Sequence, residues 1–170
     1  RLIEQINKLE CDLLALTGDL IDRPTCLPWL GTVFGRLDAP MGKYYVLGNH
    51  DCRIADEMIL RGMLKQAGLI ATNGQWITVD RRNDRIFLAG NELPWYPGAQ
   101  ELSTPPRIAD GGIGLKILLS HSPDQIHWAA DRGFDLMLAG HPHGGQIRPP
   151  LVGPIVSPSR CGPQYARGEF

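Results

Sequence analysis

Several features are scarce or missing in this 170-residue chain, and each absence excludes a class of protein. The four cysteines stand far apart, at positions 11, 26, 52 and 161, so a disulfide scaffold is excluded and a reducing compartment is expected. No apolar run approaches the ~18 residues of a transmembrane helix, and the first residues do not resemble a signal peptide. We therefore expect a protein that is cytoplasmic or peripheral to a membrane on its cytoplasmic side.

A strong charge of one sign is also missing. The 17 Lys and Arg residues nearly balance 18 Asp and Glu residues, which leaves a formal net charge of -1. Without a basic surface, broad electrostatic binding to nucleic acid is not expected. The composition, 43% hydrophobic and 21% charged, predicts that residues 1–170 form one globular domain. Because the first residue is Arg rather than Met, we expect this domain to be part of a longer chain.

Apolar segments alternate with helical patterns along most of the chain. Strands are predicted at 13–17, 43–47, 116–119 and 136–138, and helices at 1–10, 27–37, 55–67 and 125–131. The helix over 1–10 is amphipathic and is expected to cover a sheet, and the apolar run 136–138 is expected to be a buried strand. A helix between the first two strands makes them parallel neighbours. The alternation predicts a layered α/β fold.

The remaining segments are less regular. Residues 76–79 and 86–89 predict a hairpin, with Arg81, Arg82 and Arg85 at its solvated tip. The Pro-rich and Gly-rich stretch 91–110 predicts a long surface loop, in which Trp95 and Tyr96 either line a substrate groove or pack onto their own domain. Residues 155–156 are expected to add one more short strand.

Four predicted strands end in residue types that bind metal ions. The four blocks are Thr17-Gly18-Asp19, Gly48-Asn49-His50-Asp51, Ser120-His121 and Gly140-His141-Pro142-His143-Gly144-Gly145-Gln146. In open α/β sheets ligands collect at the carboxyl ends of strands, and Asp, Asn and His offer the oxygen and nitrogen donors that divalent ions accept. A lone histidine inside a helix, such as His127, is interpreted as structural or exposed. A glycine-flanked His-x-His at a strand exit instead favours metal binding.

Together these blocks resemble the calcineurin-like metallophosphoesterases, whose signature reads Asp-x-His, Gly-Asp, Gly-Asn-His-Asp/Glu, a further His, and Gly-His-x-His. The closing Gly-His-Pro-His-Gly-Gly-Gln is most similar to the bacterial phosphodiesterase branch of that family. The resemblance covers nearly the whole chain and implies a sandwich of two sheets flanked by helices. The Asp-x-His block, which supplies two ligands of the second metal ion in the family, has no counterpart in these residues.

The resemblance also implies a set of metal ligands. It assigns Asp19 as the bridge between two divalent ions, whose identity as Mn, Fe or Zn stays open. Asn49, His121 and His141 complete one ion site, and His143 belongs to the other. Because the second site lacks its Asp-x-His ligands here, we expect this chain to bind one ion better than two.

The implied reaction is the hydrolysis of phosphate esters, chiefly phosphodiesters, by a water molecule that two metal ions activate. In this assignment His50 is the proton donor and Asp51 orients it. The expected partner is a phosphate-ester substrate, either a small molecule or a lipid headgroup.

Two other interpretations stay open at this point. A metal-poor interaction scaffold with the same fold would be expected to lose ligand positions, whereas five expected ligands and His50 are all present. A structural zinc module fits poorly, because closed zinc sites favour cysteine-rich tetrahedral sets.

Overall fold

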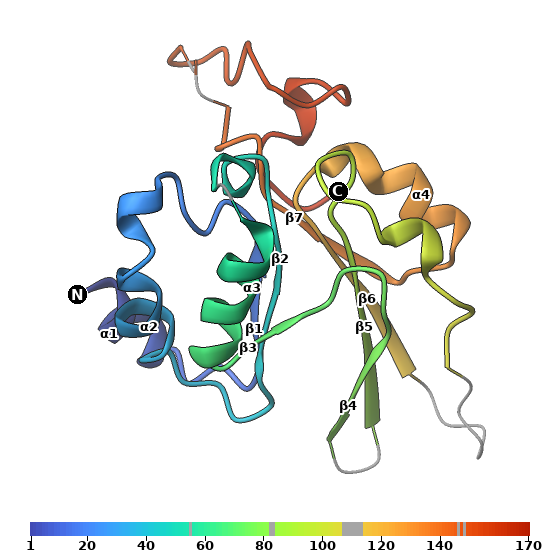
Figure 1. Cartoon of the computed structure of the whole chain (residues 1–170). Helices are drawn as coiled ribbons and strands as arrows, with labels where there is room; N and C mark the ends of the chain where they lie inside the picture. Colours follow the sequence, from blue (N-terminus) through green and yellow to red (C-terminus); the bar gives the residue numbers. More distant parts are fainter. Residues whose placement is uncertain (55, 82–83, 107–113, 146, 148) are drawn as a thin grey trace.

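Two β-sheets pack face to face at the centre of the molecule (Figure 1). The structure is a computed structural model that describes residues 1–54, 56–81, 84–106, 114–145, 147 and 149–170. The first sheet contains three parallel strands, β1 (Leu14–Thr17), β2 (Lys43–Val46) and β3 (Leu69–Ala71). The second contains β4 (Ile77–Arg81), β5 (Asp84–Asn91), β6 (Gly114–Ser120) and β7 (Leu136–Ala139), of which β4 alone is antiparallel to its neighbour. The predicted α/β sandwich is thus confirmed.

Helices cover the outer faces of both sheets (Figure 1). Helices α2 (Trp29–Phe34) and α3 (Glu57–Gln66) pack on the first sheet, and α4 (Ile126–Asp131) packs on the second. Helix α3 begins where the Asp56 carboxylate accepts hydrogen bonds from the backbone N–H groups of Met58 and Ile59. Helix α2 is shorter than predicted because Pro28 occupies its N-cap and Gly35 its C-cap.

Strand β2 shows how the layers are built. Its side chains alternate, so that Tyr45 and Leu47 pack toward the helices with Leu60 and Leu64 of α3. Tyr44 and Val46 point the other way and form the layer between the sheets with Val79, Leu88 and Leu119. Because both of its faces are buried, β2 consists almost entirely of apolar and aromatic residues.

Two expectations about burial are wrong. Helix α1 (Leu2–Asn7) forms as predicted but has no buried residue, and Leu2 and Leu9 are 69% and 75% exposed. The Asn7 side chain bonds to the backbone after α2, at Arg36 and Asp38, which holds α1 beside that helix rather than over a sheet. Strand β7 is only half-buried, with Leu136 44% exposed, because it forms the edge of the second sheet beside β6.

The irregular segments differ from expectation mainly in length. The predicted hairpin is confirmed, but its strands run to Arg81 and from Asp84, and β3 was not anticipated. At the predicted tip Arg85 is exposed and pairs with Asp80, while the Arg81 side chain and Arg82 lie outside the described residues. Residues 107–110 of the predicted loop also lie outside them. Val156 makes a single bridge to Ile147 instead of a strand.

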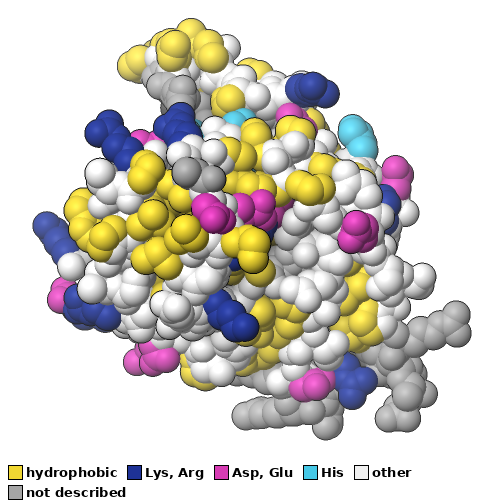
Figure 2. All heavy atoms as spheres, viewed as in Figure 1, with side chains coloured by type: hydrophobic (Ala, Val, Ile, Leu, Met, Phe, Trp, Pro, Cys, Tyr) yellow, Lys and Arg dark blue, Asp and Glu magenta, His cyan; other side chains and the backbone are white. Residues whose placement is uncertain are grey.

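Exposed apolar side chains gather in two places on the face shown in Figure 2. One group lies over α2 and α3 and includes Trp29, Val33, Met58 and Ile59. The other lies on the segment 149–156, which projects above the sandwich in Figure 1. Across the described residues, no helix has the length and hydropathy needed to cross a lipid bilayer. The four cysteines are free thiols.

The connection that follows β3 approaches β5 closely at Gly90, so we expect this position to be sensitive to substitution. A Cβ there would lie 2.4 Å from Thr72 Oγ1 and 2.7 Å from the Asn73 backbone nitrogen. We expect Gly90→Ala to lower the free energy of unfolding by about 1–3 kcal/mol, measured by urea denaturation, because the inserted methyl group overpacks this contact. Gly62→Ala, on α3, is the control. A Cβ on Gly62 would meet no described atom within 4 Å outside the helix's own backbone, so this change should raise the free energy of unfolding by about 0.5–1 kcal/mol. Equal stabilities of the two variants would contradict this account.

Candidate metal centre

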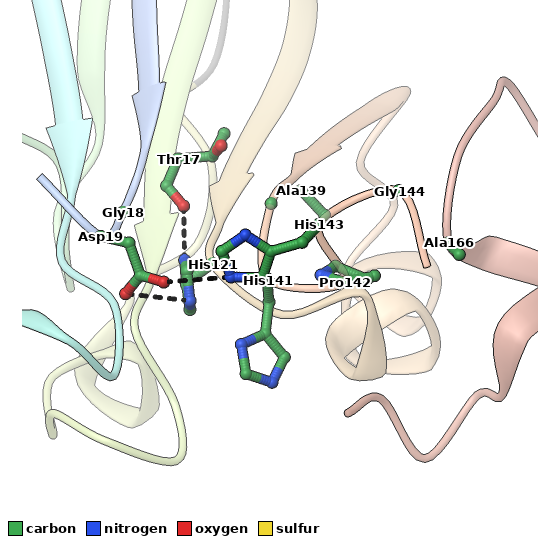
Figure 3. Close-up of a pocket in the computed structure, with 11 residues that line it drawn as sticks. Thr17, Gly18, Asp19, His121, Ala139, His141, Pro142, His143, Gly144 and Ala166 are labelled. Carbon is green, nitrogen blue, oxygen red and sulfur yellow. Dashed lines mark hydrogen bonds and ion pairs between the residues drawn. The ribbon is translucent and has the colours of Figure 1, made fainter. Parts of the chain in front are cut away.

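The four predicted ligand blocks meet at one edge of the sandwich. Asp19 and Asn49 follow β1 and β2 of the first sheet, whereas His121 and His141 follow β6 and β7 of the second. Carboxyl ends of parallel strands lie at the same edge of a sheet, so each sheet brings its own pair of loops to this place. Figure 3 shows Asp19 and the three histidines His121, His141 and His143 around an open pocket of about 410 Å³.

Glycines let these loops approach one another. A Cβ on Gly18 would lie 2.4 Å from His121 Nδ1, and one on Gly48 would lie 2.4 Å from Asp19 Oδ1. The backbone is also strained at the predicted ligands: Asp19, His141 and His143 have φ values of 55°, 63° and 52°. Such left-handed conformations cost about 1–2 kcal/mol each for residues with a Cβ, so the surrounding fold must hold them in place.

His121 presents a nitrogen lone pair to the centre. Its Nδ1 lies 2.7 Å from the Thr17 carbonyl oxygen, and because that oxygen can only accept, Nδ1 is the donor. The opposite nitrogen, Nε2, lies 3.0 Å from Asn49 Oδ1 and 3.4 Å from Asp19 Oδ1. Lone pairs on three such atoms repel one another unless a metal ion or a further proton supplies positive charge. The donor set therefore fits a bound cation.

Two buried polar atoms nearby also lack partners. Among the described residues, neither Asp19 Oδ2 nor His141 Nδ1 has a hydrogen bond. Burial lowers the pKa of His141, which favours the neutral imidazole that binds metals. Burial alone would raise the pKa of Asp19, but hydrogen bonding, including that from the backbone N–H of His50, holds it below its ordinary value. Asp19 is thus an ionised carboxylate with one oxygen free for a cation.

The second oxygen of Asp19 faces two more histidines. His50 Nε2 and His143 Nε2 each lie 3.9 Å from Asp19 Oδ2, and the ligand atoms of the three residues are within 4.8 Å of one another. His143 is about half exposed, whereas His121 is fully buried. The two oxygens of Asp19 therefore point to different groups of donors, as a bridging carboxylate requires.

The carboxylate that contacts the His50 ring is Asp22 rather than Asp51. Asp22 Oδ1 accepts a hydrogen bond from His50 Nδ1 at 2.6 Å and also pairs with Arg53, and the His50 bond lowers the pKa of Asp22. Asp51 is buried, which raises its pKa, and its oxygens accept from the backbone N–H groups of Gly48 and Ile21 at 2.7 and 3.0 Å. The sequence did not single out Asp22, although it lies three residues beyond Asp19 in the loop that follows β1.

Trp95 also belongs to this region. Its ring contacts those of His121 and His141, with centroids 5.0 Å away in each case, and it packs against the core cluster on the first sheet. Neighbouring Tyr96 is buried in that cluster, as the packing interpretation expected. His127 is exposed on α4, away from the pocket, in agreement with its interpretation as a non-ligand.

Comparison with known proteins agrees with this site. The family model for calcineurin-like phosphoesterases matches residues 1–145, and the chain therefore belongs to the calcineurin-like phosphoesterase family. It is 32% identical to the uncharacterised metallophosphoesterase YkuE of Bacillus subtilis, over 97% of this chain and 58% of the relative. It is 30% identical to the phosphodiesterase YaeI of Escherichia coli, over 86% and 54%.

A third relative is a zebrafish (Danio rerio) transmembrane protein with a metallophosphoesterase domain, 29% identical over 95% of this chain and 40% of the relative. The chain thus spans about half the length of the curated relatives it matches. No solved structure matches it.

The geometry predicts that Asp19 dominates cation binding. In Asp19→Asn the amide keeps one acceptor oxygen but loses the negative charge and the second oxygen. We expect Mn²⁺ affinity, measured by isothermal titration calorimetry, to fall by more than about 100-fold. Loss of a residue that contacts a ligand but not the metal typically lowers affinity by roughly 10–100-fold, and loss of a ligand should cost more. Asp131→Asn, at an exposed position of α4, is the control and should leave the affinity unchanged. An unchanged affinity in Asp19→Asn would rule out Asp19 as a ligand.

Proposed function

We propose that this chain provides the metal centre of a phosphoesterase that hydrolyses phosphodiesters. The observation that carries the proposal is the convergence of Asp19, Asn49 and the three pocket histidines at one edge of the sandwich. Within the described part of the chain, the buried atoms Asp19 Oδ2 and His141 Nδ1 have no hydrogen-bond partner there. Family membership supports phosphate-ester chemistry, and the name phosphodiesterase given to the YaeI relative supports the narrower class. In a metal-poor interaction scaffold these ligand positions would be expected to be lost, whereas all five are present.

We propose two divalent ions, Mn, Fe or Zn, as cofactors. Asp19 Oδ1, Asn49 Oδ1 and His121 Nε2, with His141 beside them, would hold one ion, and Asp19 Oδ2 with His143 would contribute to the other. When bound, such ions supply an activated water and neutralise charge on the phosphoryl oxygens. The expected substrate is a small phosphate ester or a lipid headgroup, because a formal net charge of -1 does not favour broad electrostatic binding of a polyanion.

In this proposal His50 gives a proton to the departing alcohol. Asp22 holds its Nδ1–H, so the proton given to the alcohol would come from the opposite nitrogen, Nε2, of a ring protonated on both nitrogens; Nε2 faces Asp19 Oδ2 at the centre. The His50 backbone N–H donates to Asp19 Oδ1 at 2.8 Å, which keeps the ring beside the carboxylate. A histidine fixed in this way can protonate an oxygen without a large rearrangement. The same closeness to Asp19 and His143 makes direct metal binding by His50 the second candidate role.

Hydrolysis of a chromogenic phosphodiester tests the overall proposal. We expect Mn²⁺-dependent turnover that EDTA abolishes and added Mn²⁺ restores. A chain that binds Mn²⁺ but shows no turnover above the metal ion alone would contradict the proposal.

Replacing His50 separates its two candidate roles. As a proton donor, His50→Gln should slow hydrolysis of an ester with a poor alkoxide leaving group by about 10²–10⁴-fold, with metal content unchanged. A nitrophenyl ester should lose much less, because its leaving group departs without a proton. Equal losses for the two esters, or a fall in metal content, would exclude the donor role.

Two further variants calibrate this measurement. Asp22→Asn removes the charge that holds the His50 ring and should give the same dependence on leaving group with a smaller loss. His127→Gln changes an exposed histidine on α4 and should alter neither rate.

A further inference from the structure

We propose that Glu92 and Arg61 are positioning residues of the metal centre, because their ion pair fixes the backbone of residues 47–51, here named the 47–51 loop. This loop carries Asn49, a proposed ligand, and His50. The inference rests on the proposed metal centre. Neither Glu92 nor Arg61 lines the pocket, so their influence must pass through the loop.

Glu92 makes the direct contact with the loop. It follows β5 in the second sheet, and its side chain is fully buried. Its Oε1 accepts a hydrogen bond of 2.6 Å from the backbone N–H of Leu47, the residue before Gly48 and Asn49. A hydrogen bond of this length to an ionised acceptor is among the stronger hydrogen bonds in proteins. A residue of the second sheet thus holds the end of a strand of the first.

Arg61 fixes Glu92 in turn. From α3, its Nη2 donates to Glu92 Oε2 at 2.6 Å and its Nη1 donates to Oε1 at 3.3 Å. The ring of Tyr96 lies beneath the guanidinium, 5.5 Å from Cζ. Arg61 also bonds to Glu57 at 2.7 Å on the outer side of α3. The two-point contact leaves the Glu92 carboxylate little freedom to rotate, so its position is set by both a helix and a sheet.

The 47–51 loop is held by carboxylates from three parts of the chain. The N–H of Leu47 donates to Glu92, that of Gly48 to Asp51, and that of His50 to Asp19. Asp19 is a proposed ligand, and Asp51 belongs to the loop itself. Glu92 is therefore an anchor from outside the loop that is not itself part of the centre.

Stability alone does not explain a charge pair at this place. Replacing a buried ion pair by apolar side chains of similar volume is often neutral or stabilising, so the pair is not needed merely to fill space. An apolar side chain, however, cannot accept a hydrogen bond from Leu47. The loop also has little room, because a Cβ on Gly48 would lie 2.4 Å from Asp19 Oδ1 and 2.6 Å from His121 Cε1. Loss of the anchor should therefore move Asn49 away from His121.

Two double variants test the role of the acceptor at position 92, because they differ only in whether that side chain can accept a hydrogen bond from Leu47. Arg61→Met with Glu92→Gln removes both charges but keeps an oxygen that can accept from Leu47. Arg61→Met with Glu92→Met removes the charges and the acceptor. We expect the Met variant to bind Mn²⁺ roughly 10–100-fold more weakly than the parent, as for other outer-sphere partners. The Gln variant loses the contact with Arg61 but keeps the acceptor, so it should bind Mn²⁺ more weakly than the parent and more tightly than the Met variant. Glu57→Gln, which removes only the outer partner of Arg61, should leave affinity unchanged.

Calorimetry without substrate measures these affinities, so the result does not depend on whether the chain hydrolyses phosphodiesters. Equal affinities of the two double variants, whether native or weakened, would overturn the positioning role. Amide hydrogen exchange of the metal-free parent provides a test that needs no variant to fold. The Leu47 amide should exchange as slowly as the amides of β2, and rapid exchange would also overturn the proposal.

Discussion

The Asp19 carboxylate is the group on which the rest of the site depends. Its Oδ1 accepts a hydrogen bond from the backbone N–H of His50 and faces His121. Its Oδ2 is buried among histidines and has no hydrogen bond from any residue that the structure describes. A buried carboxylate is costly unless positive charge or donors surround it, and here the loops of both sheets converge to surround it. The glycines at 18 and 48 are needed because any larger residue would occupy the space of this carboxylate or of His121.

Because the centre spans the edges of two sheets, its geometry depends on how the sheets pack. The segments that follow β1 and β2 supply Asp19, Asn49 and His50, and those that follow β6 and β7 supply His121, His141 and His143. The layer between the sheets, formed by Tyr44, Val46, Val79, Leu88 and Leu119, therefore sets the distances between ligands. A cation that binds this arrangement, and not the unfolded chain, stabilises the sandwich in return.

Three carboxylates at this edge of the sandwich hold the 47–51 loop in place and are not proposed metal ligands. Asp51 and Glu92 each accept a hydrogen bond from an N–H of the 47–51 loop, and Asp22 holds the His50 ring. The assignment that followed from the family resemblance had Asp51 orienting His50. Neighbouring residues at a strand exit point in different directions, however, and Asp51 is turned into the core while Asp22 reaches the ring from another loop.

The sequence by itself determined the alternation of strands and helices, the ligand types at four strand ends and the need for glycine beside them, because each of these is a local requirement. It did not determine that β7 is a half-exposed edge or that α1 stays outside the core, since periodicity does not say which neighbour covers a face. Only the tertiary structure decided which carboxylates meet His50 and the Leu47 N–H. Those contacts join residues 28 and 45 positions apart, and folding alone brings them together.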